Sequence, residues 1–115
     1  MKRFARSLTH AGKGILFTLK NERNFQIEAV ATGVVGLLMA WLPLSTTENI
    51  FLILATTAVL TIELVNTAIE RVMDILKPRI HPYARVVKDI MAGAVLVVSC
   101  GALLTGIIIF SPHFF

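Results

Sequence analysis

The sequence predicts an all-α membrane protein with an N-terminal amphipathic surface helix followed by three transmembrane helices. Of its 115 residues, 56% are hydrophobic and only 16% are charged, and the mean hydropathy is +0.77. A soluble domain usually carries about 25% charged residues, so the composition favours lipid surroundings. Three spans of about 20 residues each use most of such a chain. We therefore expect one integral-membrane domain over residues 1–115.

The surface helix is expected over about residues 3–20. Apolar residues recur there at spacings of three and four, and basic residues occupy other positions of the helix. The apolar positions are Phe4, Leu8, Ala11, Ile15 and Leu19. A basic helix with one apolar face is typical of a segment that lies in the membrane interface.

The three spans are expected at about residues 25–44, 50–76 and 86–110. The first is followed by the polar turn Ser45–Asn49, which we expect to separate it from the second. The second is followed by the segment Lys77–Arg85, which contains two prolines and is expected to be a loop. The third is uncharged throughout its last 21 residues, from Ile90 to Phe110, and is the clearest transmembrane segment.

The distribution of charge predicts the topology and argues against nucleic-acid binding. All eleven Lys and Arg residues fall in two blocks, Lys2–Arg23 and Arg71–Lys88. Neither block is an unbroken basic run with aromatic residues interleaved as stacking platforms. Basic blocks in alternate loops fall on one side of the membrane, as the positive-inside rule requires. We therefore expect the N-terminus in the cytoplasm and the C-terminus outside.

An acidic stripe marks the candidate site, because Glu63, Asn66, Glu70 and Asp74 end an otherwise apolar run. At about 100° per residue, these side chains fall within an arc of about 80° on one helix face. Ionisable groups at membrane depth are costly and usually functional. Three carboxylates on one face call for a cation, and a divalent metal is the simplest.

The stripe is compatible with phosphoryl transfer. Mg²⁺ binds one or two carboxylates and completes its shell with water and substrate phosphates. Lys88 lies where it would neutralise phosphate oxygens, and the deeper Glu63 where it would accept a proton from a lipid alcohol. Residue patterns alone leave three classes open: a metal-dependent membrane enzyme, a proton- or cation-coupled transport subunit, and a small structural membrane protein.

Other catalytic signatures are missing from the sequence. It contains no Gly-x-x-x-x-Gly-Lys-Ser/Thr phosphate loop and no Ser or Cys nucleophile constellation. The three histidines do not follow a zinc pattern, and Cys100 is the only cysteine, so an intrachain disulfide is excluded.

Four segments of the chain resemble a known family. They are Lys20–Phe25, Glu63–Asp74, His81-Pro82 and Lys88–Val95. Together they resemble the bacterial diacylglycerol kinase/undecaprenol kinase family, over about residues 4–110. The combination Glu-x-x-Asn-Thr-Ala-Ile-Glu-x-x-x-Asp, with Lys-Asp after a short loop, is the most specific part of the resemblance.

The resemblance implies a small lipid kinase that uses ATP and Mg²⁺ and forms a homotrimer with shared active sites in the bacterial inner membrane. It implies that Glu63 is the catalytic base and that Glu22 and Glu70 are metal ligands. The implied nucleotide-site residues are Arg3, His10, Glu22, Asn66, Glu70, Asp74, His81, Lys88 and Asp89.

The resemblance also favours undecaprenol over diacylglycerol as the lipid acceptor. Asn24-Phe25 and the His81-Pro82 loop look more like the undecaprenol kinases. The chain departs from the family pattern at His10, where members often have Tyr, and at Glu28, where undecaprenol kinases often have His.

Overall fold

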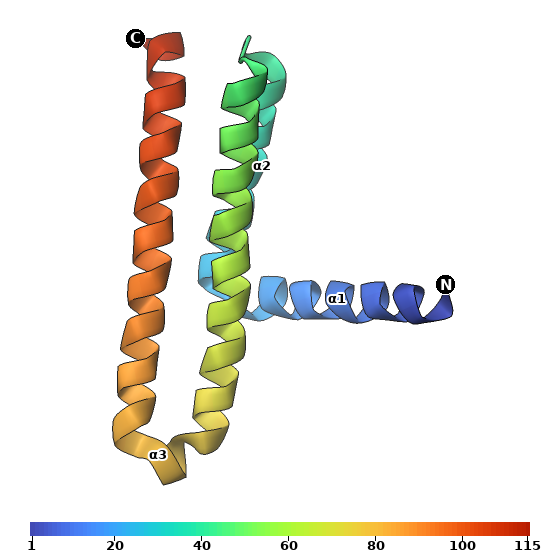
Figure 1. Ribbon diagram of the computed structural model, residues 1–115, viewed down its shortest axis with the longest axis vertical. Coiled ribbons are helices and arrows are strands. Elements are labelled where there is room, and N and C mark those ends of the chain that lie inside the picture. The colour runs from blue at the N-terminus through green and yellow to red at the C-terminus, as the bar shows by residue number, and fades with distance from the viewer.

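The computed structural model describes residues 1–76 and 82–115, so the predicted nucleotide-site residue His81 and its neighbours 77–80 lie outside the described residues. Within the described ranges the chain forms three helical elements: α1 (Lys2–Asn21), α2 (Arg23–Trp41) and α3 (Thr46–Phe114). Element α3 folds back on itself, so that its green and red parts run side by side (Figure 1). We call Thr46–Leu76 its first arm and Pro82–Phe114 its second arm.

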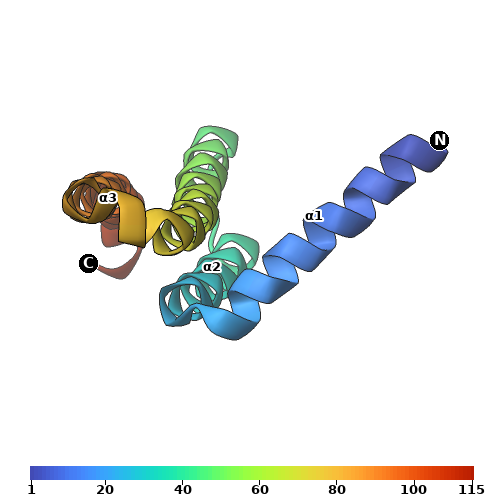
Figure 2. The same cartoon turned by 90° about the horizontal axis from the view of Figure 1, so that it is seen from below.

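The corner between α1 and α2 is a single residue, Glu22. Its backbone is extended, with φ −113° and ψ 113°. Its N–H donates to the carbonyl of Thr18 at 2.8 Å, and its own carbonyl accepts from the N–H of Gln26 at 3.1 Å. Because both groups of Glu22 are satisfied, the chain changes direction there without leaving orphan hydrogen-bonding groups. α1 consequently extends sideways from the other helices (Figures 1 and 2).

The first arm of α3 begins earlier than the sequence suggested. A capping box starts the helix at Thr46, where we expected about residue 50. The hydroxyl of Ser45 accepts from the N–H of Glu48 at 3.1 Å, and the carboxylate of Glu48 accepts from the N–H of Ser45 at 2.9 Å. This reciprocal pair satisfies two N–H groups at the helix start, so residues read as a polar turn become the first helical turn.

The other boundaries differ from the expected ones by a few residues. α2 ends at Trp41 rather than residue 44, because Pro43 lacks an N–H and disfavours helical backbone in the residue before it. The second arm includes residues 82–85, which we expected in a loop, and continues to Phe114. Ala84 is buried there, and such packing commonly overrides local propensity.

Three segments are long and apolar enough to cross a membrane: Arg23–Trp41, Thr46–Leu76 and Pro82–Phe114. Their large apolar side chains mostly face outward; Leu37 is 73% exposed and Val97 is 72% exposed. Soluble monomers rarely expose apolar surface on this scale, whereas lipid covers it without cost. The predicted all-helical fold with three segments able to span a membrane is therefore confirmed.

The two ends of α3 meet at one end of the molecule. Nε2 of His113 lies 3.9 Å from Oε2 of Glu48, which places the last turn of the second arm beside the first turn of the first arm. Glu63, Glu70 and Asp74 follow on the first arm at increasing distance from this end, at about 1.5 Å per residue. The acidic stripe therefore lies toward the end where α1 joins α2.

Candidate active site

Glu63 lies on the first arm and is buried, with 3% of its surface exposed. The residue one turn later, Thr67, is also buried, and its hydroxyl donates to the carbonyl oxygen of Glu63 at 3.0 Å. The Thr67 hydroxyl is thus satisfied by the backbone of the helix. The Glu63 carboxylate therefore stays available to a ligand. A carboxylate buried within an apolar span is costly and marks a functional site.

Carboxylates from three elements gather around Glu63. Glu28 on α2, Glu70 on the same arm and Glu22 at the α1–α2 corner all lie close enough to repel its charge. The family resemblance implied that Glu22, Glu63 and Glu70 belong to one site, whereas Glu28 was left without a role. Four acidic groups in one region of a membrane protein require cations or protons to offset their repulsion.

Arg71 supplies one such cation. Its Nη2 lies 2.7 Å from Oε1 of Glu22, and its guanidinium carbon lies 5.6 Å from the centre of the Phe17 ring. Charge-assisted hydrogen bonding and a cation–π contact together join the first arm to the end of α1. Sequence reasoning missed Arg71, since its acidic partner is 49 residues away along the chain.

Asn66 and Glu70 act as a pair on the acidic stripe. Nδ2 of Asn66 donates to Oε1 of Glu70 at 3.3 Å, one helical turn away. The amide therefore orients this carboxylate and leaves its second oxygen available. This is the side-by-side arrangement that the spacing of the stripe predicted.

Lys88 brings positive charge from the second arm. Its Nζ lies 2.8 Å from Oδ1 of Asp74, and Glu70 is also close enough to attract it. Asp74 and Lys88 are separated by 14 residues in the chain, and their contact joins the two arms beside the acidic stripe. The structure thus brings together six of the predicted site residues: Glu22, Glu63, Asn66, Glu70, Asp74 and Lys88.

Glu22 and Glu70 carry the type of oxygen donor that a magnesium ion uses when it shares its shell with substrate. Within residues 1–76 and 82–115, no group of three or more His, Cys, Asp or Glu side chains is placed to hold a metal by itself. Mg²⁺ seldom needs such a group, because it takes one or two carboxylates together with water and phosphate oxygens. The guanidinium on Glu22 also shows that this carboxylate accepts a cation in the folded chain.

Three other predicted residues lie outside the cluster. Arg3 and His10 are exposed on α1, and the N-terminal part of this helix points away from the other helices (Figure 2). Arg3 is nineteen residues from the corner, about 28 Å along the helix. Asp89 is exposed next to Lys88. Their roles at the nucleotide site stay predictions.

Comparisons with known proteins agree with this arrangement. The sequence profile described as prokaryotic diacylglycerol kinase matches residues 9–110. The chain is 38% identical to the undecaprenol kinase of Bacillus subtilis (strain 168), over 97% of this chain and 91% of that protein. It is 31% identical to the diacylglycerol kinase of Escherichia coli (strain K12), over 96% of this chain and 93% of that protein.

A third relative is the diacylglycerol kinase of Synechocystis sp. (strain ATCC 27184 / PCC 6803 / Kazusa), which is 32% identical over 87% of this chain and 58% of that protein. The profile match spans the corner at Glu22, the first arm, most of the second arm and the whole cluster around Glu63. The chain therefore belongs to the prokaryotic diacylglycerol kinase family.

Proposed function

We propose that this lipid kinase transfers the γ-phosphoryl group of ATP to undecaprenol in a Mg²⁺-dependent reaction that yields undecaprenyl phosphate. The observation that carries the proposal is the buried Glu63, set in a span within electrostatic reach of the carboxylates of Glu22, Glu28 and Glu70. Membership of a lipid kinase family assigns the reaction class, and the undecaprenol kinase relative supports the choice of acceptor. Diacylglycerol, the acceptor named for two other relatives, is the alternative.

Glu63 is the proposed general base. The hydroxyl of the lipid alcohol would give its proton to this carboxylate while its oxygen attacks the γ-phosphorus. A new oxygen–phosphorus bond forms, the bond between the γ-phosphorus and the bridging oxygen breaks, and ADP leaves. Such a positioned base typically contributes 10²–10⁴-fold to the rate. The apolar span around Glu63 keeps water away from the attacking oxygen.

The residues nearer the membrane surface are proposed to hold the nucleotide. Glu22 and Glu70 would bind Mg²⁺, which when bound offsets the charge that develops on the transferring phosphoryl group. Lys88 would contact phosphate oxygens as a point charge. Asn66 would orient the Glu70 carboxylate, and Asp74 would hold Lys88 in place. Arg3, His10, His81 and Asp89 complete the proposed nucleotide site.

The proposed setting is the bacterial inner membrane, as a homotrimer with shared active sites and one integral-membrane domain over residues 1–115. With three spans, the N-terminus and the acidic cluster would face the cytoplasm, where ATP is present, and the C-terminus would lie outside. The basic helix α1, which runs out sideways from the spans, suits a position on the cytoplasmic membrane surface (Figure 1).

The experiment is transfer of radiolabelled phosphate from ATP to a panel of lipid alcohols by purified protein. We expect labelled undecaprenyl phosphate as the main product and a lower rate with diacylglycerol. A rate that is higher with diacylglycerol would reverse the choice of acceptor. Absence of any labelled lipid would contradict the kinase proposal and reopen the transport alternative.

Glu63→Gln tests the role of Glu63 in the chemical step. It keeps the size of the side chain and removes the base, so we expect kcat to fall at least about a hundredfold. Binding of ATP with Mg²⁺ should change little, because the proposed nucleotide contacts lie elsewhere. A variant that keeps turnover but loses nucleotide binding would contradict the role of Glu63.

A further inference from the structure

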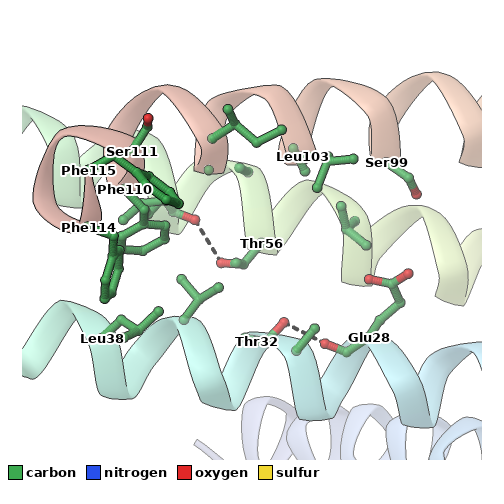
Figure 3. Close-up of a pocket in the computed structure, with 18 residues that line it drawn as sticks. Glu28, Thr32, Leu38, Thr56, Ser99, Leu103, Phe110, Ser111, Phe114 and Phe115 are labelled. Atoms are coloured by element: carbon green, nitrogen blue, oxygen red, sulfur yellow. Dashed lines mark hydrogen bonds between the residues drawn. The ribbon is translucent and has the colours of Figure 1, made fainter.

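An apolar groove runs between α2 and the two arms of α3. Its volume is about 670 Å³, within the ~300–1,000 Å³ typical of ligand sites. Glu28 and Ser99 lie at one end of it, and Phe110, Phe114 and Phe115 lie at the other (Figure 3). We propose that this groove holds the hydrocarbon chain of the acceptor alcohol and is built for one long chain. The inference rests on the proposed lipid kinase function.

The walls of the groove offer hydrocarbon rather than polar contacts. Two of its hydroxyl groups are already satisfied within their own helices: Thr32 donates to the carbonyl of Glu28 at 2.8 Å, and Thr56 donates to that of Leu52 at 2.9 Å. These threonines therefore present mainly their methyl groups to the groove. A ligand lying here needs no hydrogen-bonding groups along its length, which is the property of an isoprenoid or acyl chain.

The polar end of the groove is continuous with the candidate active site. Glu28 lines the groove and is also one of the carboxylates close enough to act on the charge of Glu63. A chain that lies in the groove therefore has its alcohol end beside the proposed base. At the other end the groove is lined by the rings of Phe110, Phe114 and Phe115 and by Ser111, away from the carboxylates around Glu63.

The length of the groove favours a chain longer than an ordinary acyl tail. Phe114 lies fifteen residues beyond Ser99 on the same helix, which corresponds to about 22 Å. The hydrocarbon core of a bilayer is about 30 Å thick, so each acyl tail of a diacylglycerol fills on average about 15 Å of depth, to the midplane. A single long isoprenoid chain fills the groove to its aromatic end.

The groove has room for an extended hydrocarbon chain along its length. Its volume is about 670 Å³, and carbon atoms of a chain and its walls are in contact at about 4 Å.

The test uses two glycines on the second arm. Gly106 lines the groove and Gly101 does not. At both positions an added Cβ meets nothing within 4 Å, so a side chain can begin there without a clash in the chain. Gly106 is seven residues beyond Ser99, so Gly106→Leu would close the groove after about 10 Å. Gly101→Leu makes the same change in helix propensity and apolar surface outside the groove.

We expect Gly106→Leu to lower kcat/KM for a long-chain isoprenoid alcohol at least about tenfold, equivalent to about 1.4 kcal/mol. A short isoprenoid alcohol that ends before Gly106 should keep its wild-type kcat/KM. Gly101→Leu should behave as wild type with both alcohols. Without ATP, the long-chain alcohol should raise the Tm of the wild type and Gly101→Leu, and leave that of Gly106→Leu unchanged.

Two outcomes would overturn the proposal. Unchanged kcat/KM of Gly106→Leu for the long-chain alcohol would show that the chain lies elsewhere. Equal losses with both alcohols, together with a change in oligomeric mass, would show that the groove is a contact between copies. If the wild type phosphorylates no alcohol, the proposed function fails, and the Tm measurement still decides whether the groove binds the chain.

Discussion

At the scale of single residues, the site depends on how charge is distributed along one helix face. Glu63 is buried within the span, and Glu70, seven residues later and about 10 Å along the helix, is only partly buried. The seven-residue spacing thus puts two carboxylates of one helix face at different depths, one buried and one partly exposed. The deeper one suits proton transfer from a lipid alcohol, and the shallower one suits a hydrated cation.

Glu70→Gln tests the separation of these two roles. The change removes the charge of one proposed metal ligand while the contact with Asn66 can persist, so we expect the Mg²⁺ concentration for half-maximal activity to rise at least about tenfold. Even residues that only support a metal ligand are typically worth 10–100-fold in metal affinity. Binding of Mn²⁺, measured by electron paramagnetic resonance in the presence of ATP, should weaken in parallel.

Glu48→Gln is the control for this experiment. Glu48 lies at the opposite end of the first arm, and glutamine can replace glutamate in its capping box. The metal dependence of this variant should match that of the wild type. If Glu70→Gln keeps its native Mn²⁺ affinity, Glu70 is not a metal ligand.

At the scale of elements, the contacts around Glu22 determine how α1 leaves the spans. Phe17 on α1, Glu22 at the corner and Arg71 on the first arm form one cluster that joins three elements. Arg71 and Glu22 are 45% and 22% exposed, so their ion pair adds little to global stability. The cluster fixes a local orientation instead, and it holds a proposed metal ligand in place.

Arg71→Ala should therefore loosen α1 without unfolding the protein. We expect faster amide hydrogen exchange in the last turns of α1, around Phe17, because the cation–π contact and the hydrogen bond to Glu22 are lost together. The free energy of unfolding should change by less than about 1 kcal/mol. Lys20→Ala removes an exposed basic residue of the same helix and should leave the exchange rates unchanged, as a control. Equal exchange in wild type and Arg71→Ala would contradict this role.

The elements show what sequence reasoning can and cannot predict. Apolar length predicted the spans, and the helical spacing predicted that Asn66 and Glu70 share a face, because both are local properties of the chain. The pairing of Arg71 with Glu22 was not predictable, since it depends on how elements 49 residues apart meet. The start of α3 was misplaced for a different reason: Ser45 and Glu48 read as a polar turn until their reciprocal hydrogen bonds are seen.

At the scale of the whole molecule, one chain brings together only part of the predicted site. Glu22, Glu63, Glu70 and Lys88 belong to one cluster, whereas Arg3 lies about 28 Å from the corner along α1. A helix of this length cannot fold back on its own cluster, because its end at Glu22 is held by Arg71. If Arg3 contacts the nucleotide, it must do so in the site of a neighbouring chain.

Co-expression of two inactive variants tests this sharing of sites in the proposed homotrimer. Arg3→Ala and Glu63→Gln should each have low activity alone, and their mixture should exceed the sum of the two. Some sites in mixed trimers would combine a native Arg3 from one chain with a native Glu63 from another. Glu63→Gln mixed with Glu70→Gln is the control, because both residues lie about 10 Å apart on one helix and no mixed site is whole. If the first pair also shows no gain, either each chain supplies its own N-terminal helix or Arg3 has no role. The activity of Arg3→Ala alone separates these two cases.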